Sequence, residues 1–107
     1  MGTLDGILKE ELARLVAAEK SYLREIKKLP KGSVQIKRIK KNNYPYLVVR
    51  KGEQVISEYL GQWSERELEE LKQAIAQRKK HEQHLREVKR NIKRLLRMVR
   101  GKRSKAI

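Results

Sequence analysis

Basic side chains gather in two segments of this 107-residue chain, and their characteristic chemistry is the binding of phosphate groups. Segment 27–51 contains nine Lys and Arg residues and no acidic residue. Segment 86–107 contains ten, opposed by one acidic side chain. Each phosphate neutralised by such a cation releases condensed counterions, so these clusters favour sequence-independent binding of nucleic acid. The candidate contacts are Lys37, Arg38, Lys40, Lys41, Lys89, Arg90, Lys93, Arg94 and Arg97.

The composition indicates a class of partner and excludes several classes of protein. A balance of 28 basic against 13 acidic residues gives a formal net charge of +15, which favours a polyanionic partner over a generic solvated surface. The chain has no Cys, which excludes a disulfide scaffold, a Cys-ligated zinc site and a thiol nucleophile. No apolar run approaches the roughly 18 residues needed to span a bilayer, and nothing reads as a signal peptide. We therefore expect a cytoplasmic protein.

The remaining groups that could carry chemistry do not form a recognisable catalytic or metal site. His81 and His84 flank Glu82, but this spacing lacks a third ligand, so the histidines are predicted to lie on a solvated helix face. The chain contains no glycine-rich phosphate loop and no paired acid and base. We accordingly predict no enzymatic activity, no cofactor and no metal.

Four aromatic residues cluster in or beside the central segment: Tyr44, Tyr46, Tyr59 and Trp63. One interpretation is a stacking platform for unpaired bases. The other is a small core, because the chain has no Phe to fill one. The core is the favoured interpretation for most of them.

The elements that position these residues begin with a helix over 3–29. Its apolar residues recur with helical spacing, Thr3 can cap its start, and Pro30 ends it. The second helix is predicted over 64–100, where Ser64 and Glu67 have the spacing of a capping box. Gly101 is expected to end that helix, and 101–107 forms a basic tail.

Between the helices, segment 33–60 is rich in Val, Ile and Tyr, which suits three strands of an antiparallel meander. Asn42-Asn43 and Lys51-Gly52 are the expected tight turns. Pro45 predicts that the middle strand pairs only after its first residues, because proline has no N–H group to donate.

The two helices are expected to fold back as an antiparallel coiled-coil hairpin. Their apolar residues match when Tyr22 lies opposite Ile75, a register that also places Glu19 opposite Arg78. The longer second helix then keeps apolar residues that nothing in the chain covers, which predicts a protein partner or a homodimer. The candidate partner-binding residues are Leu95, Leu96 and Val99.

Segment 29–62 carries Gly32-Ser33, Tyr44-Pro45-Tyr46-Leu47, Arg50-Lys51-Gly52 and Tyr59-Leu60-Gly61. This pattern resembles a family of short, uncharacterised prokaryotic proteins, and it is similar to the N-terminal stretch of some insertion-sequence transposases. The resemblance implies a mobile-element or phage context and carries over no activity and no functional residue.

Together these observations predict one α+β domain, 1–107, made of a long helix, a three-stranded antiparallel β-meander and a longer helix. The predicted function is non-enzymatic nucleic-acid binding, with DNA favoured over RNA. The alternative is a coiled-coil protein-interaction module that docks on or regulates a nucleoprotein complex. A third hypothesis is a membrane-surface helix over 85–100.

Overall fold

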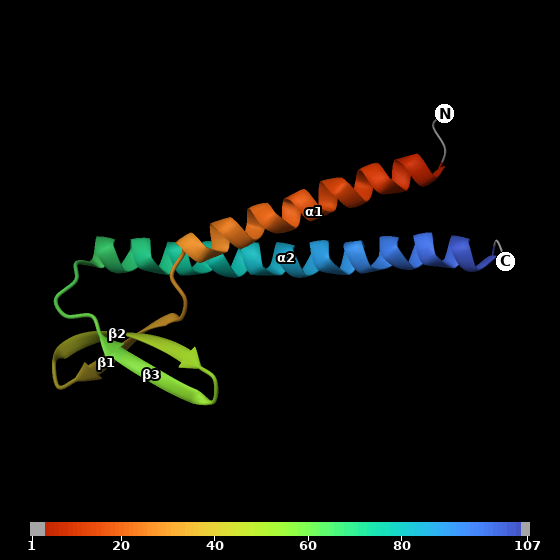
Figure 1. Cartoon of the computed structure of the whole chain (residues 1–107). Coiled ribbons are helices and arrows are strands. Elements are labelled where there is room, and N and C mark those ends of the chain that lie inside the picture. Colours follow the sequence, from red (N-terminus) through yellow and green to blue (C-terminus); the bar gives the residue numbers. More distant parts are fainter. Residues whose placement is uncertain (1–3, 106–107) are drawn as a thin grey trace. The chain divides into compact units, whose positions relative to one another are not determined.

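The computed structural model describes residues 4–105, with side chains described to residue 100. Along the chain it contains α1 (Leu4–Lys28), β1 (Ser33–Ile39), β2 (Asn42–Lys51), β3 (Gln54–Tyr59) and α2 (Glu65–Lys105) (Figure 1). The predicted α+β fold is confirmed, with a three-stranded antiparallel sheet between two helices. The predicted cap Thr3 and the last two residues of the basic tail lie outside the described residues. Neither helix within 4–105 is apolar enough over a sufficient length to cross a bilayer.

Contacts divide the chain into two compact units. The helical unit is formed by residues 1–27 and 80–107, so it contains α1 and the C-terminal part of α2. The sheet unit is formed by residues 28–79, so it contains the three strands and the first turns of α2.

In the helical unit, α1 runs antiparallel to α2 (Figure 1). Leu8, Leu15 and Leu85 are buried there. The ring of Tyr22 lies 5.8 Å from the His81 ring and 5.6 Å from the His84 ring, measured between centroids. The antiparallel pairing of the helices is therefore as expected, and the histidines are part of it. The prediction that they lie on a solvated face is wrong.

The predicted helix register is wrong by about two helical turns. Tyr22 lies beside His81 and His84 rather than opposite Ile75. The predicted register also places Glu19 opposite Arg78. In the structure Arg78 instead donates a hydrogen bond of 2.7 Å to the Leu29 carbonyl, within the sheet unit.

The observed register covers the apolar end of α2. The register at Tyr22, shifted by about two turns from the predicted one, brings the first turns of α1 level with the last turns of α2. Coverage there is partial, because Ile7 and Met98 remain about half exposed. Three residues expected to be uncovered are half-buried, and Leu8 is buried with them: Leu95, Leu96 and Val99. Full burial of one such side chain is worth about 1.5–3 kcal/mol, which favours this register over one that leaves the three in water.

The start of α2 matches its prediction, and its end does not. The amide of Glu67 donates to Ser64 Oγ at 3.1 Å, and Ser64 N donates to Glu67 Oε1 at 3.4 Å, which is the predicted capping box. The helix continues through Gly101 to Lys105. An interior glycine costs about 1 kcal/mol relative to alanine but does not prevent helical geometry.

Both hairpin turns differ from their predicted positions. Lys40-Lys41 connects β1 to β2, and Gly52-Glu53 connects β2 to β3. Asn42-Asn43, predicted to be the first turn, instead opens β2. The observed register pairs Val34 with Leu47 and Ile36 with Pro45, so apolar residues meet across the strands on one face of the sheet. That pairing determines the turn more strongly than the local preference of asparagine does.

Pro45 lies inside the central strand without breaking its pairing to β1. Its carbonyl accepts a hydrogen bond of 3.0 Å from the Leu60 amide, so this carbonyl faces the β3 side. In an antiparallel sheet, the N–H and C=O groups of one residue point toward the same neighbouring strand. At Pro45 that strand is β3, so the pairing of Pro45 with Ile36 of β1 requires no N–H group from the proline. The expectation of delayed pairing is wrong for β1. It holds for β3, where pairing begins at Tyr46.

Candidate nucleic-acid interface

Seven members of the second basic cluster, those whose side chains the structure describes, lie on one side of α2, which we call the basic helix face. Its successive members are one or three residues apart, a spacing that keeps them on one side of the helix over about 21 Å at 1.5 Å per residue. All seven are exposed: Arg86, Lys89, Arg90, Lys93, Arg94, Arg97 and Arg100. Five predicted contacts, Lys89, Arg90, Lys93, Arg94 and Arg97, are thus brought together.

The basic helix face suits the binding of phosphate groups. Five of its seven members are arginines, whose planar guanidinium groups can bind phosphate oxygens through two parallel hydrogen bonds. Glu87 is the one acidic side chain between Arg86 and Arg100. The face belongs to a long, continuous helix, so its cations are held at regular spacing along one line.

The structure separates the predicted contacts of the first cluster. Register places Lys37 on one face of the sheet and Arg38 on the other, because side chains alternate along a strand. Lys40 and Lys41 form the turn between β1 and β2. All four are exposed, but they do not share one face of the sheet.

One face of the sheet carries three tyrosines, and we call it the tyrosine face. The register aligns Lys37 with Tyr44 and Tyr46 with Tyr59, so the rings lie on the same side. Ring centroids lie 6.0 Å apart for Tyr44 and Tyr59, and 5.5 Å apart for Tyr46 and Tyr59. The Lys37 Nζ atom lies 4.6 Å from the centroid of the Tyr46 ring, within the range of a cation–π contact.

The prediction that most aromatic residues fill a core is wrong. Tyr59 is 50% exposed and Trp63 is 36% exposed, while Tyr44 and Tyr46 are half-buried. The opposite, apolar face of the sheet, which includes Val34, is the face turned to α2. Its contribution to the core is aliphatic, and the strand alternation directs the tyrosines away from it.

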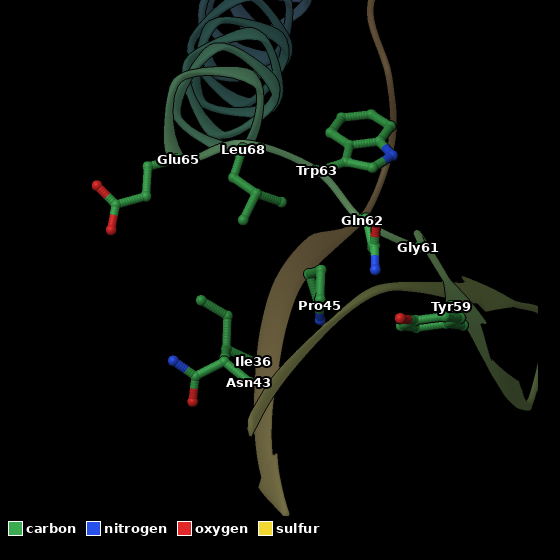
Figure 2. Close-up of a pocket in the computed structure, with 9 residues that line it drawn as sticks. All are labelled: Ile36, Asn43, Pro45, Tyr59, Gly61, Gln62, Trp63, Glu65 and Leu68. Atoms are coloured by element: carbon green, nitrogen blue, oxygen red, sulfur yellow. The ribbon is translucent and has the colours of Figure 1, made fainter. Parts of the chain in front are cut away.

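A cavity of about 320 Å³ lies between the end of the sheet and the start of α2. Figure 2 shows sheet residues Ile36 and Pro45 on one side, with Trp63 and Leu68 on the other. Tyr59 also lines the cavity, so the tyrosine face and the cavity share a side chain. The volume is at the lower end of the range for small-ligand sites. Sequence reasoning missed this site because it depends on how the loop before α2 passes the sheet.

The described residues do not support a metal site. No group of three or more potential metal ligands occurs among them. The two histidines contact Tyr22 instead.

Comparison with protein-family models, with curated proteins and with solved structures finds no match to this chain. The resemblance of segment 29–62 to short prokaryotic proteins therefore stays a prediction.

Proposed function

We propose that the protein binds nucleic acid without catalysing a reaction, through the phosphate backbone. The observation that carries this proposal is the basic helix face, with seven exposed cations on one side of α2. The choice of DNA over RNA, and a mobile-element or phage context, rest on the resemblance of segment 29–62 alone.

The dimensions of the basic helix face fit a polyanion better than a small anion. Its length of about 21 Å corresponds to roughly 12 phosphate charges on double-stranded DNA, which carries one charge per 1.7 Å of axis. Exposed Lys and Arg side chains can reach several of these phosphates without first being taken out of water. The resulting affinity is independent of base sequence and falls steeply with salt.

The test removes four of the seven cations of the basic helix face and measures the salt dependence of binding. The variant carries Lys89→Gln, Arg90→Gln, Lys93→Gln and Arg94→Gln, which keep helix-forming side chains at exposed positions. The matched control carries Lys9→Gln, Lys20→Gln, Arg24→Gln and Lys27→Gln, which remove the same charge from exposed positions of α1. Both are titrated with labelled duplex DNA between about 50 and 200 mM salt.

We expect the slope of log affinity against log salt to become shallower by about 3 to 4 in the α2 variant, close to 0.9 per lost contact. The α1 control is expected to keep most of the slope. Equal losses in the two variants would show that net charge, rather than the basic helix face, drives binding. An absence of salt-dependent binding in the wild-type protein would overturn the proposal.

A further inference from the structure

We propose that the tyrosine face and the adjoining cavity bind unpaired bases, so that the nucleic acid bound by this protein includes a single-stranded segment. The inference rests on the proposed function and adds the substrate class. Its basis is the ring arrangement at Tyr44, Tyr46 and Tyr59 together with the cavity beside Tyr59.

The tyrosine rings offer stacking surfaces to a base. Tyr59 lies on β3, an edge strand of the sheet, and is half exposed. The rings of Tyr44 and Tyr46 stand beside it at tilts of 53° and 50°. Bases of a single strand stack on exposed aromatic side chains of this kind irrespective of sequence. Bases within a duplex are already stacked on their neighbours, so they present no free face to these rings.

The charge of the tyrosine face complements a phosphate backbone. Alternation along the strands places Lys37 and Arg50 on this face, while Glu58 is on the opposite one. No acidic residue in β1, β2 or β3 shares the face with the tyrosines. A strand whose bases stack on the rings therefore meets two cations at the edges of the platform and no anion.

The cavity adjoins the platform through Tyr59, whereas its other sheet residues, Ile36, Asn43 and Pro45, lie on the opposite face. Its volume of about 320 Å³ has room for one base. Pro45, Tyr59 and Trp63 provide flat or aromatic walls, and Asn43, Gln62 and Glu65 add hydrogen-bonding groups. Figure 2 shows that these residues come from the sheet, the loop and the start of α2, with the Asn43 and Glu65 polar groups directed away from Trp63. The cavity thus combines apolar walls with three polar side chains, one of which is the acidic Glu65. A base in the cavity lies directly beside Tyr59.

Trp63 provides a direct measurement, because it is the single tryptophan of the chain. We would titrate the protein with oligothymidylate, with oligouridylate and with a duplex DNA, each about 8 nucleotides long. A base entering the cavity quenches the indole fluorescence. We expect quenching by one or both single strands and little by the duplex, and the two single strands distinguish DNA from RNA.

The matching variants test the contribution of the Tyr59 ring. Tyr59→Thr removes a stacking ring and keeps a strand-forming residue, and Tyr59→Phe keeps the ring. Val55→Thr, on the same strand and the same face, is the control. We expect Tyr59→Thr to weaken binding of the single strand about 5- to 150-fold, the effect of one base stack. Binding by Tyr59→Phe and Val55→Thr should stay near wild type, and the duplex affinity should not change.

The outcomes separate this inference from the proposed function. Single-strand binding that is unchanged in Tyr59→Thr, with no quenching of Trp63, overturns the inference. If salt-dependent duplex binding persists in that case, the proposed function stands. If the wild-type protein binds none of the three ligands, both are overturned. Should Tyr59→Thr unfold, the quenching of Trp63 in the wild-type protein still decides the question.

Discussion

Lys40 has a backbone conformation that lysine rarely adopts. Its φ is 59°, and among non-glycine residues of the described chain it alone has a positive φ. The corresponding residue of the second hairpin is Gly52, with φ 64°. For a residue with a side chain, this left-handed backbone conformation costs roughly 1–2 kcal/mol. The cost is offset by the strand register that the turn permits, in which Val34 pairs with Leu47.

We therefore predict that Lys40→Gly stabilises the protein. The relief of strain exceeds the additional conformational entropy of an unfolded glycine, which is about 0.5–1 kcal/mol, so the net gain is expected to be up to about 1 kcal/mol. Unfolding in urea measures it. Lys41→Gly is the control, because it removes the same charge from the same turn at a residue whose φ is not positive.

The expected effect of Lys41→Gly is a loss of roughly 0.5–1 kcal/mol, because only the entropic cost applies. If both variants shift the midpoint equally, the change comes from charge and the strain argument fails.

Residue types predicted which side chains are exposed better than they predicted which side chains contact one another. The basic residues of both clusters are exposed up to Arg100, the last residue whose side chain is described, as their charge requires. The positions of the aromatic rings depended on the strand register, which places Tyr44, Tyr46 and Tyr59 together on the face turned away from α2. The choice between core and platform could not be made from residue type, because tyrosine suits both.

At the scale of the element, the start of α2 depends on a short local motif. Ser64 Oγ accepts from the Glu67 amide at 3.1 Å and lies 3.0 Å from Glu67 Oε1. The side chains of Ser64 and Glu67 thereby satisfy backbone groups that have no partner within the helix.

We predict that Ser64→Ala lowers the free energy of unfolding by about 1 kcal/mol, the usual value of an N-cap. Thermal or urea unfolding followed by helical circular dichroism measures it. Ser64→Thr should retain most of the stability, because its hydroxyl can accept the same hydrogen bond. A loss of equal size in both variants would contradict the capping explanation.

Elements governed by local signals were predicted well from the sequence. The proline after α1 and the capping box before α2 placed those boundaries within about one residue of the observed ones. The turns and the end of α2 were misplaced, because cross-strand pairing at Ile36 and helix continuation at Gly101 overrule the local preference.

At the scale of the whole molecule, the register between α1 and α2 was the main prediction that failed. Several registers match apolar with apolar residues along a repetitive helix. The observed register is favoured because it leaves three apolar side chains near the C-terminal end of α2 half-buried rather than exposed: Leu95, Leu96 and Val99. The free-energy difference between two registers is the sum of many small contacts, so no single residue in the sequence indicates which register is adopted.

The register can be tested by cross-linking. A photoreactive phenylalanine analogue replaces Tyr22, and the cross-linked peptides are identified by mass spectrometry after trypsin digestion. We expect capture of the peptide that holds His81 and His84, because both rings lie within 6 Å of the Tyr22 ring. Capture of the peptide containing Ile75 would restore the register predicted from the sequence. The same analogue at the exposed Ser21 is the control, with little capture expected.

The order of the sheet, β1-β2-β3, leaves β1 and β3 each with one strand neighbour among the described residues. Such edges can join edge to edge with a second copy. A net charge of +15 opposes that contact, because two copies repel each other before their edges meet. The repulsion is screened by salt and is cancelled by any bound polyanion. Conditions that neutralise this protein therefore remove the electrostatic protection of its two sheet edges.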